Sequence, residues 1–254
     1  MVIRDSWTLL AAMAVTMGCS LVNAPSSHTR GRGEAPVDAG PPAAPQLRLV
    51  HLARDTGSID LYANDQMLAG DLPFAEVSQP GEVDEGLVAL RVNRAGTMDV
   101  LAERSFELDP SHEYTLTLHG DEEEAPFERQ LDLLILNDDA SGLDTVTKIR
   151  LAVVHVATPV VAGQLVAVGP GGMNTLLADD FGFTAVALLS ELDSKEYVVG
   201  FDAGANGIVD LTFDLPSLVP GTYANVFVAT RPDDSVFLLV NTQLGATLQI
   251  DANP

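Results

Sequence analysis

Leu47–Ala53 reads LRLVHLA, and Leu151–Ala157 reads LAVVHVA. Each stretch is a short apolar run with a histidine near its end. A short apolar run of this kind, bounded by turn residues, is typical of a buried β-strand. Because the same run occurs at two distant places, the sequence predicts that one structural unit is present in two copies.

Further matches follow the two runs in the same order. They pair His51 with His155, Phe74–Val77 with Phe183–Val186, Gly96–Asp99 with Gly207–Asp210, Leu108–Pro110 with Leu218–Pro220, and Tyr114 with Tyr223. Small insertions in loops explain the slight drift in spacing, and a preserved order is the signature of an internal repeat.

The segments between these matches indicate β-structure. Ser58–Tyr62 and Tyr114–His119 alternate apolar and polar residues, while Leu87–Asn93 and Thr97–Leu101 flank a turn as a hairpin would. Few segments show a helical period. The pattern predicts an all-β fold of two tandem immunoglobulin-like or transthyretin-like β-sandwiches, with about seven strands each.

The predicted organisation has five parts. They are a signal peptide (1–18), a lipidated cysteine with a Pro/Ala/Ser-rich tether (19–46), the first sandwich (47–138), a linker (139–148), and the second sandwich with a tail that can add an edge strand (149–254). Because the linker is short and polar, the two sandwiches should sit close together rather than swing freely.

The charge is strongly negative. The chain holds 13 Lys and Arg against 36 Asp and Glu, a formal net charge of -23. Such a surface repels nucleic acid and anionic lipid headgroups. It favours cations and basic partners, or it simply keeps the protein soluble. The single cysteine excludes an intrachain disulfide.

The amino terminus has the features of an export signal. Trp7–Met17 is apolar but shorter than the about 20 residues of a membrane-spanning helix. Gly18 and Cys19 then resemble the lipobox of bacterial lipoproteins, although Thr16 stands where an aliphatic residue is usual. Cleavage after Ala24, giving a plain secreted protein, is the alternative.

The resemblance to lipoproteins also implies a location in the cell. Cys19 would be lipidated and would hold the protein in the bacterial cell envelope. Ser20 is not the aspartate associated, in lipoproteins, with retention at the inner membrane. We therefore expect attachment to the outer membrane.

The order VHLARDTGSIDLY (50–62), PFAEVS (73–78) and LDPSHEYTL (108–116) resembles an uncharacterised bacterial envelope domain, the domain of unknown function 4397. In the second copy LVPGTYANVFVA (218–229) fits the same pattern, whereas the stretch after His155 departs from it. The resemblance covers residues 47 to 242 in two copies. It implies secreted or surface-anchored β-sandwiches and no established activity.

His51 is the first candidate for chemistry. With Asp55 and Asp60 nearby it could ligate a metal or act as a base. The alternative is a strand histidine bonded to a neighbouring turn. The second copy keeps His155 but has Thr158 and a proline where an acid should stand, which favours the structural interpretation.

A second candidate is a loop that could bind calcium. Asp202, Asn206 and Asp210 supply oxygens at spaced positions around a glycine, as Ca²⁺ requires. Gly204 brings no ligand, however, and Phe213 stands where a bidentate glutamate should close the site. The alternative is a hairpin turn.

Taken together, the sequence predicts a non-enzymatic envelope lipoprotein with a structural role or a protein- or glycan-binding role through the sandwich loops. A calcium- or small-ligand-binding module is the alternative, and a hydrolase is the last. The chain contains no G-x-S-x-G, H-E-x-x-H or C-x-x-C motif. We expect no cofactor and no nucleic-acid partner.

The lipid anchor is tested by replacing Cys19 with alanine. Wild-type protein should fractionate with membranes and carry the mass of a lipidated cysteine, because burying acyl chains in a bilayer gives lasting attachment. The variant should lose both the added mass and the attachment. An unmodified wild-type chain beginning at Pro25 would show ordinary secretion instead.

Overall fold

The computed structural model describes residues 42–122 and 129–253. The predicted signal peptide, Cys19 and most of the tether lie outside these residues, as does part of the acidic loop that follows Asp121. The chain from Pro41 onward forms one compact unit. No helix of the described part is long and apolar enough to cross a membrane.

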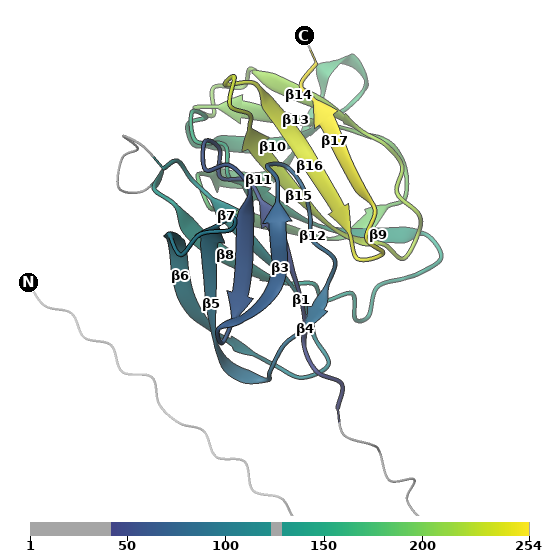
Figure 1. Cartoon of the computed structure of the whole chain (residues 1–254). Coiled ribbons are helices and arrows are strands. Elements are labelled where there is room, and N and C mark those ends of the chain that lie inside the picture. The colour runs from purple at the N-terminus through teal and green to yellow at the C-terminus, as the bar shows by residue number, and fades with distance from the viewer. Residues whose placement is uncertain (1–41, 123–128, 254) are drawn as a thin grey trace, which may run out of the picture. The chain divides into compact units, whose positions relative to one another are not determined.

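The first repeat contains eight strands within the described residues (Figure 1). They are β1 (Gln46–His51), β2 (Ile59–Ala63), β3 (Gln66–Leu72), β4 (Gly81–Glu82), β5 (Gly86–Arg94), β6 (Val100–Leu108), β7 (Glu113–His119) and β8 (Asp132–Asn137). They form two sheets with the strand orders β4-β1-β7-β8 and β3-β2-β5-β6.

The second repeat contains nine described strands. They are β9 (Lys148–His155), β10 (Gly163–Val168), β11 (Asn174–Phe181), β12 (Val186–Asp193), β13 (Tyr197–Ala203), β14 (Leu211–Leu215), β15 (Tyr223–Thr230), β16 (Val236–Thr242) and β17 (Thr247–Asp251). The sheet orders are β12-β9-β15-β16-β17 and β11-β10-β13-β14. A short 3-10 turn, η2 (Pro170–Gly172), joins β10 to β11.

The two repeats share one strand order. Each central pair, β1–β7 and β9–β15, is parallel, and the remaining pairs within the sheets are antiparallel. His51 ends β1 and His155 ends β9. The predicted all-β class is confirmed. The number of strands exceeds the predicted seven for two reasons. Strand β4 has only two residues, which is too short for a sequence pattern, and the tail after Thr242 adds β17.

One of the sequence matches was wrong by one residue. Tyr114 pairs with Leu47, whereas Tyr223 pairs with Arg150, the residue before Leu151. A shift of one residue turns a strand side chain to the opposite face of its sheet. Tyr114 therefore packs inside the first sandwich, while the Tyr223 hydroxyl lies near Asn137 of the first repeat.

Each sandwich has its own core. Alternating residues of β1, β2, β5 and β7 fill the first, including Leu47, Leu49, Ile59, Leu61, Leu90 and Leu116. The corresponding strands, together with β14, fill the second, including Leu151, Val153, Leu165, Phe201, Phe213 and Val226. Because side chains alternate across a strand, the residues between these positions point to the other face of the sheet.

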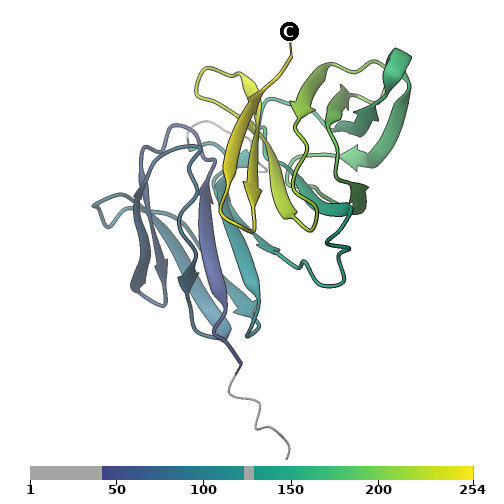
Figure 2. The same cartoon turned by 90° about the vertical axis from the view of Figure 1, so that its right-hand side faces the viewer.

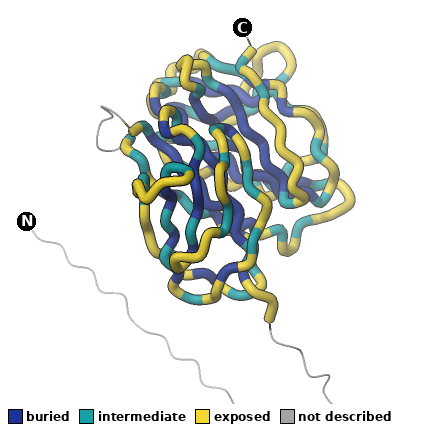
Figure 3. Tube along the Cα trace, in the orientation of Figure 1, coloured by how far each residue is buried: buried dark blue, intermediate teal, exposed yellow. Residues whose placement is uncertain are grey.

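That other face is also buried in the two sheets that contain β1 and β9, which we call the inner sheets. A third apolar cluster joins them, the interface cluster, with Val50, Leu52, Leu136, Val154, Phe227, Phe237 and Leu239. All residues of β15 and all but the first of β7 are buried (Figure 3). The repeats are therefore joined through the faces of their inner sheets (Figure 2).

The contact between the inner sheets relates equivalent residues. Leu118 pairs with His51 and Val228 with His155, so counting back three residues makes Thr115 and Asn225 equivalent. These two side chains bond to each other across the interface, with Asn225 Nδ2 3.0 Å from Thr115 Oγ1. A residue that contacts its own equivalent is the mark of a two-fold, isologous interface.

A buried hydrogen-bond network surrounds this contact. Asp138 accepts from Thr115 Oγ1 at 2.7 Å and from Asn225 Nδ2 at 2.8 Å, and Tyr223 donates to Asn225 Oδ1 at 3.2 Å. Burial raises the pKa of Asp138, while its bonds to Asn225 and Thr115 act in the opposite direction. The network thus satisfies polar groups that the packing removes from water.

Arg48 extends the network along the interface. Its side chain is buried and its Nε lies 3.8 Å from Asp138 Oδ2. Its terminal nitrogens donate to Thr242 O at 3.1 Å in the second repeat and to Glu113 Oε2 at 3.1 Å in the first. The guanidinium therefore ties the two repeats together while keeping its charge balanced.

Replacing Asn225 with alanine should destabilise the whole chain. The change leaves a carboxylate oxygen of Asp138 without its amide donor in a buried place, which costs about 2 kcal/mol. Asn174→Ala, at an exposed strand start, should change stability by less than about 0.5 kcal/mol. Urea unfolding followed by circular dichroism measures both, and equal effects would contradict the role of the network.

Candidate functional site

His51 has a structural environment. Its ring is fully buried, with Nε2 2.8 Å from the carbonyl oxygen of Gly57 and 3.3 Å from Thr56 Oγ1. Burial lowers the pKa of His51, and the bond to Gly57 partly opposes that effect. Asp55 is an exposed turn residue with φ 67°. The histidine fastens the turn between β1 and β2.

Asp60 caps turns with its carboxylate. One oxygen accepts from the backbone N–H of Asp71 at 2.8 Å and the other from that of Gly96 at 2.9 Å. Asp60 pairs across the sheet with Asn93 of β5. Both oxygens of this buried group therefore hold backbone in place.

In the second repeat a buried carboxylate also caps a turn, but it comes from the neighbouring strand. The pair that corresponds to Asp60 and Asn93 is Gln164 and Asp202. Asp202 accepts from the backbone N–H of Asn206 at 2.9 Å and of Gly207 at 2.7 Å. The acid that seemed absent after His155 is thus present across the strand pair, capping the turn between β13 and β14.

These contacts also describe the loop considered for calcium. Asp210 Oδ2 accepts from Ala203 N at 2.7 Å, and Asn206 Oδ1 accepts from Ile208 N at 2.9 Å. The side-chain oxygens thus face the amides of their own hairpin. Across residues 42–122 and 129–253, no group of three His, Cys, Asp or Glu is placed to hold a metal ion.

His155 is enclosed by aromatic rings. Its ring centroid lies 5.6 Å from that of Phe181, 6.4 Å from Phe183 and 5.4 Å from Phe201. The side chain is fully buried, and neither ring nitrogen has a partner among the described residues. Burial lowers the pKa of His155 to about 4. A substrate could not reach this ring without local opening.

His119 approaches the same rings from the first repeat. Its centroid is 5.5 Å from that of Phe183, in an edge-to-face arrangement. Burial lowers the pKa of His119 to about 4 as well. The two histidines therefore flank one phenylalanine at the contact between the repeats, where both are held neutral.

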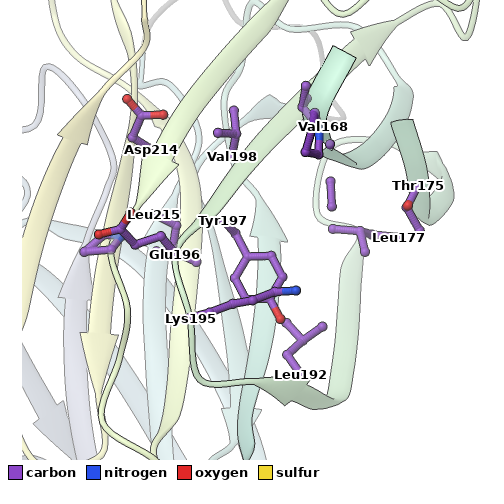
Figure 4. Close-up of a pocket in the computed structure, with 14 residues that line it drawn as sticks. Val168, Thr175, Leu177, Leu192, Lys195, Glu196, Tyr197, Val198, Asp214 and Leu215 are labelled. Atoms are coloured by element: carbon purple, nitrogen blue, oxygen red, sulfur yellow. The ribbon is translucent and has the colours of Figure 1, made fainter. Parts of the chain in front are cut away.

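The structure shows a different candidate site, a cavity of about 940 Å³ at one end of the second sandwich (Figure 4). It lies where β10 and β14 end and β13 begins. Its apolar wall includes Val168, Leu177, Leu192, Tyr197, Val198 and Leu215, and its polar groups come from Thr175, Lys195, Glu196 and Asp214. Cavities of this size commonly hold small ligands.

The inner side of the cavity is closed by the core. Leu177, Leu192, Tyr197 and Leu215 line the cavity and also a void of only about 10 Å³, whose other walls are core side chains such as Val153 and Val226. The hydroxyl of Tyr197 donates to Asp193 O at 3.0 Å. Burial raises the pKa of Tyr197. Because the void is too small for a ligand group, a ligand would be held in the outer cavity, against these apolar side chains.

The equivalent end of the first repeat has smaller hollows. Strand pairing aligns Ala63 with Ala167 and Gln66 with Thr175, but the hollow there is only about 180 Å³. Leu68 closes it by packing over Gly81, where an added Cβ would lie 2.5 Å from Leu68 Cδ1. A separate hollow of about 300 Å³ adjoins Asn64 and Asp65. The equivalent ends of the two repeats have therefore diverged.

The turn between the second and third strands of each repeat explains part of this difference. In the first repeat Asn64 occupies a two-residue turn, accepts from Ala89 N at 3.0 Å and donates to Asp84 Oδ2 at 3.3 Å. In the second repeat the longer segment 169–173, with η2, takes its place. The longer connection leaves the mouth of the cavity open.

Sequence reasoning missed the cavity because its lining comes from five strands and three connections between them. Each lining residue looks like an ordinary strand or turn position. The available signal was the glycine-rich segment Gly169–Gly172, which stands in place of the tight turn of the first copy.

The comparison with family models gives a match that covers the first repeat, the linker and the start of the second repeat. Residues 45–165 match the family model of a domain of unknown function (DUF4397), and this confirms the resemblance over that stretch. The match ends in β10, so for later residues the resemblance stays a prediction. No curated protein matches this chain.

Acid should weaken the fold through His119 and His155. Their pKa is about 4 in the folded chain against 6.5 for an unperturbed histidine, so the unfolded chain binds protons that the folded chain does not. Stability is complete above pH 6.5 and falls as the pH drops toward 4, by up to roughly 3 kcal/mol for each residue. His155→Leu should flatten this decline, and His112→Gln should not. Guanidinium midpoints from pH 7.5 to 4.5 test this, and unchanged slopes for His155→Leu would refute it.

Proposed function

We propose that this chain is a non-catalytic binding protein of the bacterial cell envelope, held by a lipid on Cys19, and that its ligand lies in the cavity of the second repeat. The observation that carries the proposal is the open cavity of about 940 Å³, where the first repeat has only smaller hollows. A large hollow with an apolar wall and a few polar groups is the usual place for a small ligand to bind.

The side chains considered for catalysis have other roles that support a binding function. His51 holds a turn, and His155 is packed among phenylalanines. Asp60 and Asp202 use both carboxylate oxygens on backbone amides. A general base must be within reach of a substrate, and the buried rings of His51 and His155 are not.

The cavity also agrees with the expectation that sandwich loops carry the function. Its rim includes Gly169–Pro170 and Lys195–Glu196, which belong to connections between strands. Loops on a rigid scaffold are common binding sites because they vary without disturbing the core. A binding role through the loops is therefore favoured over a purely structural one.

The proposal is tested by filling the cavity. A library of small glycans, short peptides and amphiphiles is screened for an increase in melting temperature and for ligand-observed NMR signals. Binding stabilises the folded state by mass action, so a true ligand raises the melting temperature in proportion to its occupancy.

Thr175→Trp should abolish the hits, since residue 175 lines the cavity and a large ring would occupy it. Gln66→Trp places the same ring at the equivalent position of the first repeat and should leave the hits unchanged. Hits that survive Thr175→Trp, or a library without hits, would refute the cavity as the binding site.

A further inference from the structure

We infer that the ligand of this cavity is a small organic cation, in which an ammonium or guanidinium group is attached to an apolar chain or ring. The inference rests on the proposed function and adds the chemical class of the ligand. Three features carry it: the charges at the rim, the contact between Lys195 and Tyr197, and the apolar wall of the cavity.

The rim holds more negative than positive charge. Glu196 and Asp214 are exposed carboxylates, and neither forms an ion pair within the described part of the chain. In Figure 4 both lie on the β14 side of the Tyr197 ring. The chain as a whole has a net charge of -23. This field raises the local concentration of cations and repels anionic ligands.

Tyr197 already contacts a cation. The Lys195 ammonium lies 5.2 Å from the centroid of the Tyr197 ring, within the range of a cation–π contact. The ring is fixed because its hydroxyl donates to Asp193 O. Lys195 is exposed and flexible, so its ammonium can leave and a ligand ammonium can take the place over the ring.

The apolar wall of the cavity accounts for the apolar part of the ligand. It includes Leu177, Leu192 and Leu215. An alkyl chain or small ring placed among them loses contact with water, whereas a charge there would have no partner. A ligand with its cation at the rim and its apolar part inward satisfies both surroundings.

The experiment uses three probes with the same chain: hexylammonium, hexanol and hexanoate. Each is titrated into the protein while amide chemical shifts near Tyr197 and Leu177 are followed by NMR. Hexylammonium should bind tightest and hexanoate weakest. Added salt should weaken only the binding of hexylammonium, because screening acts on the charged groups at the rim.

Two variants separate the contributions. Lys195→Ala removes the competing cation and should tighten hexylammonium binding roughly two- to fivefold. Arg104→Ala removes a cation from the Phe106 ring in the first repeat and should change nothing. Replacing Glu196 with Gln and Asp214 with Asn together should weaken hexylammonium and leave hexanol unchanged.

The outcomes distinguish this inference from the proposed function. Hexanol or hexanoate binding as tightly as hexylammonium would overturn the cationic class and leave the cavity as a site. Binding of none of the three probes, beside library hits that Thr175→Trp abolishes, would do the same. Weaker binding to Lys195→Ala would also overturn the inference, while a cavity that binds nothing from the library overturns the proposed function itself.

Discussion

The packing of the two inner sheets against each other is the constraint on which the rest of the structure depends. It buries β7 and β15 on both faces and places Thr115 against Asn225. An antiparallel sheet at a surface can keep one face polar, but these sheets cannot. Their polar side chains need partners inside. Arg48 lies 3.8 Å from Asp138 as an ion pair, and both side chains hydrogen-bond to neighbouring groups.

The same contact explains which features of the duplicated unit had to be kept. Equivalent residues meet across it, so a change in one repeat alters the surroundings of its counterpart in the other. The apolar runs that carry His51 and His155 supply this face and remain alike. The ends of the sandwiches lie outside the contact, and there the hollows differ from about 180 to about 940 Å³.

The sequence was sufficient for the all-β class, the order of the repeat and the hairpin between β5 and β6, because period-two alternation and turn residues are local properties. The sequence was not sufficient where the pairing of strands decides which residues are equivalent. The exchange of Asp60 for Asp202 is visible only when strands are aligned across the sheet. Tyr114 and Tyr223 matched by motif, yet register puts them on opposite faces. The cavity depends on how far Leu68 and Leu177 reach, which no pattern encodes.

The difference between the two ends can be connected with the amino terminus. In the first repeat the chain that leads into β1 adds to the closed end: Pro45 accepts from Val83 N at 3.0 Å, and Ala44 lines the small hollow. If that leading segment continues to an anchor at Cys19, as proposed, the attached segment itself helps to close the hollow of the first repeat. The second repeat receives its chain from the linker, and its end is free to change. Duplication followed by attachment through one copy therefore leaves the other copy as the place where a binding site can evolve without loosening the fold.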